Sequence, residues 1–438
     1  MTSPSPAPAP APAASVAVLP LANASGDPDK DYFADGLTDY LHGSLVGVRA
    51  LRVASRGSAA AQHGQVSLAD LGRALNVAAV LDGSVTRLGG QLRLSARLRS
   101  AADGSELWTV QVDEKLDELF PVLRGLTDRV LGTLGAAPTP EERRALDHVP
   151  TRDARALDPY LRARHVSGQI RRSSQDSSLL QYGDAITADP QFALAHAGLG
   201  EVHAMLFTYW LSSDEHLQGA DAASARAVEL ASMLAETHLV RGMALSLNRR
   251  HDAAEEEFLT ALALKPNLFE AHYHYARHCR TSGRLAEAAQ WFESAGALRP
   301  EDYSTPALLA SVYVGLKREA DARTAQLRAV AIAERRLKLV PDDERALYLG
   351  AGCLSSLGDS GRAREWAKRA VAMEPDDSAV LYNVACVYAL LGLADSAIDC
   401  LERSVTNGFG HWEWIEHDSD LDPLREHPRF LALLQRKR

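Results

Sequence analysis

Residues 22–36, ANASGDPDKDYFADG, contain Gly26 and four aspartates, where an apolar run gives way to an amphipathic segment. Strand, loop and helix in this order often hold a phosphate on backbone amides at the helix N-terminus. However, the glycine and lysine patterns of nucleotide-binding loops occur nowhere in the chain, and the aspartates would repel a phosphate. Asp27 and Asp29 instead suit a helix start, where the helix dipole favours acidic side chains. A metal held by these carboxylates is an open alternative that the spacing does not require.

The stretch HYHYARH, residues 272–278, is a second candidate for chemistry, because His274 and His278 lie four residues apart on one helical face. A zinc site built on such a pair needs further ligands, and none follows at a suitable spacing. His272 falls on the core side of the same helix. We therefore predict structural histidines, no metal site and no cofactor.

The composition is that of a multidomain globular chain. Its 438 residues exceed the size at which a single core stops growing, and 46% of them are apolar. The net charge of −10 argues against nucleic acid as a partner, since that needs clustered lysine and arginine. Four cysteines without a C-x-x-C pair favour a reducing cytoplasm. The uncharged stretch 378–394 is too short to span a membrane, so we expect no membrane contact.

Small residues recur with a fixed period in the second half of the chain. Pro266 and Pro300 are 34 residues apart, and so are Pro341 and Pro375. In this 34-residue register three positions of each unit are small: Gly200, Gly242, Ala276, Ala310, Ala351 and Ala385 at position 8, Ala220, Ala254, Ala288, Ala322, Ala363 and Ala397 at position 20, and Ala227, Ala261, Ala295, Ala329, Ala370 and Ser404 at position 27. Helices that cross closely have no room for bulk, so these positions predict stacked helical hairpins.

This register resembles the tetratricopeptide (TPR) repeat, and HDAAEEEFLTALALKPN and GRLAEAAQWFESAGALRPE match its second helices. The resemblance implies an all-α solenoid of about seven repeats over residues 156–409. Its first unit is degenerate, with Tyr182 and Ala185 in register. Residues 410–438, which include Trp412 and Trp414, are expected to cap the open end of the stack.

Stacked hairpins curve, and their first helices line a concave surface. Arginine and tyrosine at positions 2, 5, 9 and 12 of the units would suit an acidic or aromatic peptide there. The predicted peptide-binding residues are Glu270, Tyr273, Arg277, Arg280, Arg345, Tyr348, Tyr382 and the adjoining Asn383. Other TPR proteins grip extended peptides with Asn at position 6 and Arg or Lys at position 2. A full set of clamp lysines is absent, so specificity for a terminal carboxylate is not expected, and solvation without a ligand is the alternative at each position.

The second repeat carries extra residues, 206–218, with Phe207, Tyr209 and Trp210 among them. Two interpretations stay open for these aromatic side chains. They pack against a neighbouring helix, or they form a patch that faces a partner.

The first part of the chain predicts an α/β domain over residues 15–137, after a proline- and alanine-rich tether at 1–14 and before a linker at 138–155. The runs SVAVLPL and LRVAS are predicted strands, and helices are expected over 30–48, 67–76 and 116–135. Three further runs, joined by Gly89-Gly90 and Asp103-Gly104, predict an antiparallel meander with one wet face. This order of elements argues against a nucleotide-binding fold with repeated parallel crossovers.

The segments SVAVLPLANASGDPDKDYFADGLTDYL, LRVASRGS, ALNVAAVLDGSV and ADGSELW resemble, in this order, the TolB amino-terminal-like domain over about residues 15–135. That domain stands in bacterial chains beside adenylate cyclase, protein kinase or DNA-binding domains, and the resemblance implies a regulatory or binding role. We therefore predict a non-enzymatic bacterial adaptor in the cytoplasm, which binds a protein or peptide partner in signalling. The alternative is a sensor that binds a small molecule in the α/β domain, near residues 22–36.

Overall fold

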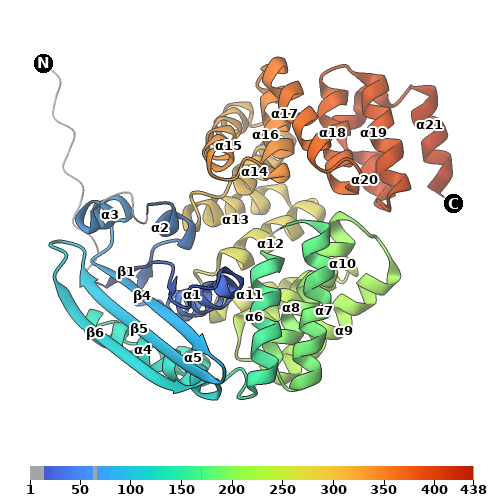
Figure 1. Ribbon diagram of the computed structural model, residues 1–438. Helices are drawn as coiled ribbons and strands as arrows, with labels where there is room; N and C mark the ends of the chain where they lie inside the picture. Colours follow the sequence, from blue (N-terminus) through green and yellow to red (C-terminus); the bar gives the residue numbers. More distant parts are fainter. Residues whose placement is uncertain (1–13, 63–66, 169, 438) are drawn as a thin grey trace, which may run out of the picture.

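The computed structural model describes residues 14–62, 67–168 and 170–437, so all of the predicted tether except residue 14 lies outside it. A small mixed sheet with helices on both faces comes first, and a long run of helices follows (Figure 1). This confirms the predicted fold class, an α/β part followed by an all-α solenoid.

The sheet has the strand order β3-β1-β4-β5-β6, with β2 beside β4. Its strands are β1 (Ser15–Val18), β2 (Ala22–Asn23), β3 (Arg52–Val53), β4 (Ala79–Leu88), β5 (Gln91–Ser100) and β6 (Glu106–Lys115). The last three form the antiparallel meander, whereas β1 pairs parallel with β3 and with β4. Gly89 and Gly104 take φ angles of 58° and 73° in the two connecting turns, a left-handed conformation that favours glycine.

Helices cover both faces of the sheet. On one face lie α1 (Asp31–Val46) and α4 (Leu119–Leu134), and on the other α2 (Arg56–Gln62) and α3 (Leu68–Leu75). Val16 and Val18 of β1 join the first core, and Ala17 joins the second, so this strand is buried on both faces. The short 3-10 helices η1 (Pro28–Lys30) and η2 (Leu116–Glu118) precede α1 and α4.

Three elements of this part did not follow from the sequence pattern. Strand β2 lies inside the loop at 22–36, helix α2 follows β3, and helix α5 (Pro140–Asp147) occupies the predicted linker. Thr139 and Glu142 begin α5 with a capping box, a local signal that the sequence did contain. The side chain of Asp27 accepts a hydrogen bond from the amide of Asp29 and so caps η1.

Seven helical hairpins follow within the described residues. They pair α6 (Ala154–Ser167) with α7 (Arg172–Ala188), α8 (Ala193–Tyr209) with α9 (Asp214–Leu230), α10 (Ala235–Leu247) with α11 (His251–Leu264), α12 (Phe269–Thr281) with α13 (Leu285–Leu298), α14 (Ser304–Gly315) with α15 (Glu319–Leu339), α16 (Glu344–Ser356) with α17 (Ser360–Met373), and α18 (Ser378–Leu390) with α19 (Ala394–Thr406). The chain ends in α20 (Trp412–His417), η3 (Ser419–Leu424), α21 (Pro428–Leu434) and η4 (Gln435–Lys437).

The recurring small residues lie where the helices meet. All of them are buried, and Ala254, Ala261 and Ala276 have no exposed surface. A Cβ on Gly242 would come within 2.9 Å of the Phe258 ring, so this close crossing requires glycine. The periodic pattern therefore marks the contacts between hairpins, as the repeat register predicts.

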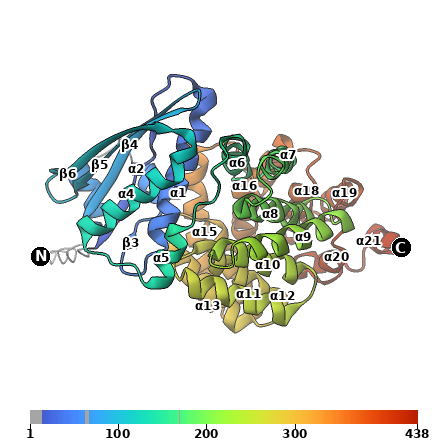
Figure 2. The same cartoon turned by 90° about the horizontal axis from the view of Figure 1, so that it is seen from below.

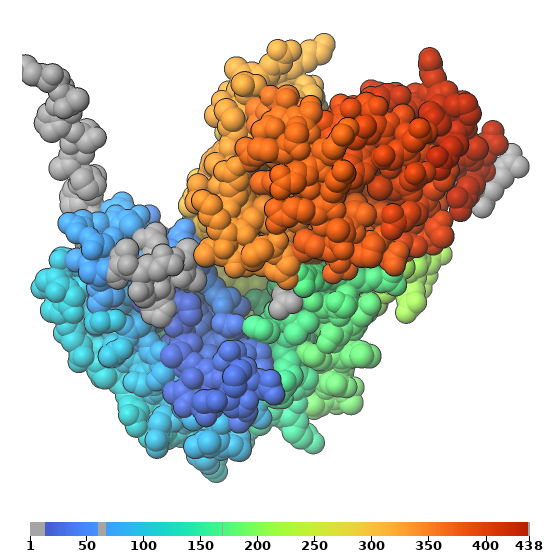
Figure 3. Space-filling view, turned by 45° about the horizontal axis from the view of Figure 1, so that its top comes forward, coloured from blue at the N-terminus to red at the C-terminus, as the bar shows by residue number. Residues whose placement is uncertain are grey.

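The helical array curls until its last hairpin meets the second one. The indole Nε1 of Trp210 donates to Asp377 Oδ2 at 2.5 Å, and the Ser378 hydroxyl donates to the carbonyl oxygen of Trp210 at 3.2 Å. His411 is 2.9 Å from the carbonyl oxygen of Phe207. Figure 3 shows the C-terminal hairpins, in orange and red, lying directly against the part of the array coloured green.

The α/β part lies against the start of this array, at α1 and α6 (Figure 2). A Cβ on Gly36 of α1 would come within 2.7 Å of Leu161 in α6, so the two helices approach closely. Over the described ranges, no helix combines the length and the hydropathy that crossing a lipid bilayer takes.

Candidate functional site

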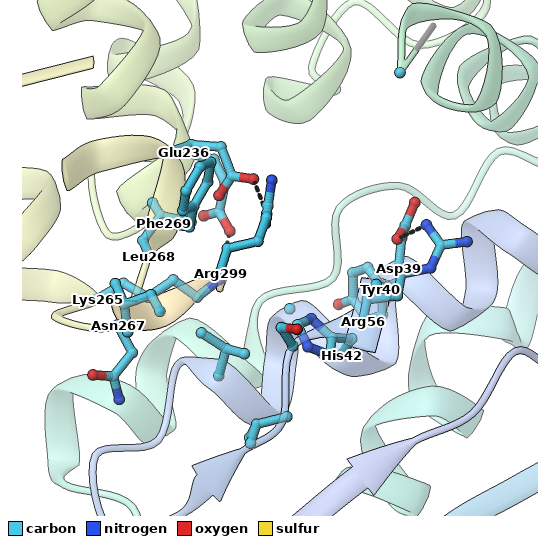
Figure 4. A pocket seen from close by; sticks show the side chains of 18 of the residues that line it. Asp39, Tyr40, His42, Arg56, Glu236, Lys265, Asn267, Leu268, Phe269 and Arg299 are labelled. Atoms are coloured by element: carbon cyan, nitrogen blue, oxygen red, sulfur yellow. Dashed lines mark hydrogen bonds and ion pairs between the residues drawn. The ribbon is translucent and has the colours of Figure 1, made fainter. Parts of the chain in front are cut away.

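A cavity of about 1920 Å³ lies between the α/β part and the first helices of the hairpins. Figure 4 shows Asp39, His42 and Arg56 of the α/β part on one side, and Glu236 and Arg299 of the hairpins on the other. The first helices of five hairpins, α6, α8, α10, α12 and α16, contribute to the lining. The concave surface predicted from the repeat is thus the wall of a partly enclosed chamber, here called the inner cavity.

The α/β part forms one side of the inner cavity, and the Glu301 carboxylate of the hairpins binds it there. Glu301 accepts hydrogen bonds from the hydroxyls of Ser55 at 2.7 Å and Ser58 at 2.9 Å. On the same side, Arg49 donates to the carbonyl oxygen of Ala263. The contacts of Glu301 link the start of α2 to the connection that follows α13, and the contact of Arg49 links the segment after α1 to the end of α11.

Ion pairs neutralise most charges on the middle of the hairpin wall. Lys265 lies 2.6 Å from Glu236, and Arg299 lies 2.6 Å from Glu270. Burial works to raise the pKa of the Glu270 carboxyl, but the Arg299 guanidinium outweighs it and lowers that pKa to about 2. Glu270, predicted as a peptide-binding residue, therefore lines the cavity as half of an ion pair.

Arg345 lines both the end of the inner cavity and a small recess beyond it, where arginine and tyrosine side chains gather. Tyr209, Tyr273, Arg277, Arg345 and Tyr348 meet there, and we call them the arginine–tyrosine cluster. The Arg345 carbon Cζ lies 5.1 Å from the centre of the Tyr209 ring, and that of Arg277 lies 5.3 Å from it. Arg345 is only 6% exposed. It donates to the hydroxyls of Tyr273 at 3.4 Å and Tyr348 at 3.5 Å, near the upper limit for a hydrogen bond.

The positive charge of the cluster perturbs its neighbours. Burial acts to raise the pKa of the Tyr209 hydroxyl, but Arg277 and Arg345 outweigh it and lower that pKa to about 8. Burial and the nearby Arg277 lower the pKa of His274 to about 3. Burial and Arg277 also lower the pKa of Arg280. Arginine side chains gathered in this way, without a carboxylate beside them, attract a negatively charged group.

The structure brings together four of the eight predicted peptide-binding residues, namely Tyr273, Arg277, Arg345 and Tyr348, and Arg280 lies one helical turn beyond Arg277. Tyr382 does not reach the cavity. It is 4% exposed, stacks on Phe409 at 4.3 Å between ring centres, and donates to Asp418 Oδ2 at 2.7 Å. Asn383 donates to the carbonyl oxygen of Ala379 within its own helix. Both were placed on the concave surface by register alone, but the C-terminal segment covers that end of the array.

The aromatic residues of the second repeat lie where the second hairpin contacts the C-terminal part of the chain. They therefore pack against neighbouring helices and do not form an exposed patch that faces a partner. Trp210 is 3% exposed and bonds to Asp377, and the Phe207 ring lies 5.5 Å from His411 in an edge-on contact. Tyr209 turns into the arginine–tyrosine cluster. The extra length of this repeat singled these residues out in the sequence. It could not predict what covers them, because Asp377 is 167 residues away from Trp210.

Two histidines of the stretch 272–278 contact separate partners. His278 bonds to the Ser246 hydroxyl at 2.8 Å, and His272 lies 2.7 Å from the carbonyl oxygen of Pro266. A different group of possible ligand atoms, from Cys386, Asp418 and Asp420, lies within 4.8 Å of one another. Repeat reasoning missed this group because its aspartates belong to the segment after the last hairpin.

Comparisons with known proteins agree with the repeat register. The tetratricopeptide repeat family model matches residues 238–303. A putative adenylate cyclase 3 of Rhizobium meliloti (strain 1021) is 29% identical over 236 residues, which are 53% of this chain and 40% of that protein. This chain therefore spans less than half the length of that relative.

Solved structures with similar helical arrays share little sequence with this chain. The Cut9–Hcn1 hetero-tetramer of the APC/C gives a TM-score of 0.43 at 13% identity, covering 74% of this chain and 53% of that one. YrrB, described as a TPR protein with an unusual peptide-binding site, gives 0.30 at 20% identity over 49% and 98% of the two chains. The type IV pilus biogenesis factor PilW gives 0.36 at 17% identity over 50% and 94%. Residues 238–303 thus match the tetratricopeptide repeat, a fold typical of proteins that bind other proteins.

Proposed function

We propose that this protein is a non-enzymatic adaptor whose inner cavity binds a segment of a partner protein or peptide. The arginine–tyrosine cluster is the observation that carries this proposal. Guanidinium groups bind carboxylates through charge-assisted hydrogen bonds, and tyrosine rings supply rigid apolar contact with a polar tip. An acidic segment with apolar or aromatic side chains is the partner chemistry that these residues favour.

The size of the inner cavity supports a segment over a small molecule. Pockets for drug-sized ligands measure roughly 300–1,000 Å³. The inner cavity, at about 1920 Å³, is larger than that range, and it extends from the α/β part to Arg345. A partner segment several residues long would use both the apolar wall and the charged end.

The α/β part enters the proposal as a regulatory module, which its resemblance to the TolB amino-terminal-like domain favours. A role in bacterial signalling and a cytoplasmic location belong to the same proposal. Four unpaired cysteines, all buried, agree with a reducing compartment. A small-molecule sensor is the second candidate, because Tyr40 and His42 of the α/β part help to line the inner cavity.

The test uses the full chain and fluorescent peptides with alternating glutamate and aromatic residues. Fluorescence anisotropy measures their dissociation constants for the wild type and for a variant that combines Arg277→Gln with Arg345→Gln. We expect binding at least tenfold weaker in this variant. The matched control, Arg369→Gln, changes a half-buried arginine outside the cavity and should leave binding unaltered. Equal affinity of the wild type and the double variant would reject the cluster as the binding surface.

For the sensor, the thermal unfolding of the full chain is measured with nucleotides, sugars and other metabolites. A ligand that binds only the folded state raises the unfolding temperature. A specific shift that Tyr40→Ala abolishes would favour the sensor over the adaptor.

A further inference from the structure

Among the described residues, Arg345 is a buried charge without a counter-charge. Its guanidinium contacts two tyrosine hydroxyls at 3.4 and 3.5 Å, and its Nε has no hydrogen-bond partner in the described part of the chain. An isolated charge buried in this way costs several kcal/mol, so proteins normally pair it. Elsewhere in the same cavity Arg299 and Lys265 each have a carboxylate within 2.6 Å.

The two carboxylates that share a recess with this arginine are engaged elsewhere. Glu344 and Asp377 line a small recess together with Arg345 and Tyr348. Glu344 forms an ion pair with Arg171 at 3.4 Å, and Asp377 accepts from the Trp210 indole. Neither lies within ion-pairing distance of the Arg345 guanidinium.

The tyrosine hydroxyls of the cluster all act as hydrogen-bond acceptors. Those of Tyr209, Tyr273 and Tyr348 all accept hydrogen bonds from arginine, so each still has its own proton to donate. None of the three donates to an acceptor among the described residues. Arg280 Nε, one turn beyond Arg277, is also buried without a partner. The cluster thus presents hydrogen-bond donors and positive charge, and it lacks an acceptor.

We propose that the arginine–tyrosine cluster is a binding site for a phosphate group, which Arg345 contacts directly and the tyrosine hydroxyls surround. A phosphate monoester has oxygens that only accept hydrogen bonds and a charge close to −2 near neutral pH. It therefore matches two guanidiniums and several hydroxyl donors better than a carboxylate with one charge. This inference rests on the proposed function where the phosphate belongs to a bound partner segment, and free phosphate is the other source.

Tyr209 is a natural reporter for the test. The chain has 12 tyrosines, and the other 11 have pKa values raised above the usual 10. Tyrosinate absorbs at longer wavelength than tyrosine, so absorbance at about 295 nm between about pH 7 and 9.5 follows Tyr209 alone. A phosphate bound beside its hydroxyl adds negative charge and raises this pKa.

The experiment titrates the full chain in chloride, inorganic phosphate or acetate at equal ionic strength. In chloride we expect one tyrosine to ionise near pH 8, and in phosphate we expect its midpoint to rise by about one unit. Arg345→Gln should abolish the phosphate-dependent rise, and Arg299→Gln, which alters a paired arginine of the same cavity, should keep it. An equal rise in acetate, or no rise in phosphate, would overturn the proposal.

Calorimetry with a short phosphoserine peptide and its unphosphorylated form identifies the source of the phosphate. Tighter binding of the phosphopeptide than of inorganic phosphate assigns the group to a partner segment, and the reverse order assigns it to a free ligand. Both results support a phosphate site, and failure of both ligands to bind overturns it. This experiment does not use the glutamate-containing peptides of the adaptor test. A negative result in one experiment therefore leaves the other proposal to be judged by its own experiment. Should Arg345→Gln not fold, Tyr348→Phe serves as the second variant, with phosphate affinity expected to fall at least threefold.

Discussion

Replacing Arg345 by methionine should stabilise the protein in the absence of a ligand. Methionine keeps much of the length and volume of the arginine stem and removes the charge. The variant loses two long hydrogen bonds, at 3.4 and 3.5 Å, and the contact with the Tyr209 ring at 5.1 Å. Long hydrogen bonds and a cation–π contact together contribute about 2 kcal/mol.

The gain comes from the charge that is no longer buried. Leaving one member of a buried ion pair without its partner costs about 3–5 kcal/mol, and Arg345 is in that state when the cluster is empty. The net free energy of unfolding should therefore rise by about 1–3 kcal/mol. For large domains each kcal/mol corresponds to about 2 °C in Tm, so we expect a rise of about 2–6 °C.

Scanning calorimetry in phosphate-free buffer measures this change. Arg299→Met is the matched control, and it should lower Tm, because it leaves the carboxylate of Glu270 without its partner. A ligand that binds the wild-type cluster stabilises only the wild type, so added phosphate should narrow the difference between wild type and Arg345→Met. A decrease of 3 °C or more for Arg345→Met would refute the reasoning and make Arg345 a structural residue.

Three further predictions concern the parts that hold the array together. Burial, together with neighbouring aspartates, raises the pKa of the Asp420 carboxyl to about 7. The folded state therefore binds this proton more tightly than the unfolded chain does, and the protein loses stability as pH rises from about 4 to 7. Asp420→Asn should thus be more stable than the wild type at pH 8, by up to about 4 kcal/mol, and show no such gain at pH 4 in urea unfolding. Glu301→Ala should increase hydrogen exchange over residues 49–58, because two hydroxyl contacts are lost, whereas Glu319→Ala, an exposed control, should not. Trp210→Phe removes the hydrogen bond from the indole to Asp377. It should lower the free energy of unfolding, measured in urea, by about 1–2 kcal/mol.

Local patterns in the sequence predicted most of the fold. The period of 34 residues and the small side chains at each crossing reflect a geometry that every hairpin repeats, so the register located the hairpins and their contacts. The meander was equally accessible, because alternating residues and glycine turns determine it within a few residues. Helix α2 and strand β2 were missed because each is short and takes its stability from tertiary contacts.

The candidate site was predictable only in part. Register placed Tyr273, Arg277, Arg345 and Tyr348 on one surface, since the concave positions recur in every repeat. It did not reveal that Tyr209 completes the cluster, because that contact joins α8 to α12 and α16 across the curl of the whole array. Register carries no information on how far an array curls.

The curl and the cluster are two results of the same packing. Trp210 and Tyr209 are neighbours in the second hairpin. Trp210 bonds to Asp377 at the start of α18, and Tyr209 turns inward between Arg277 and Arg345. A ligand that draws these arginines toward Tyr209 therefore stabilises the closed array, and a change that opens the junction at Trp210 removes one wall of the site. On the proposed function, binding at the cluster and closure of the array would be thermodynamically linked, so a partner bound there would favour the closed form.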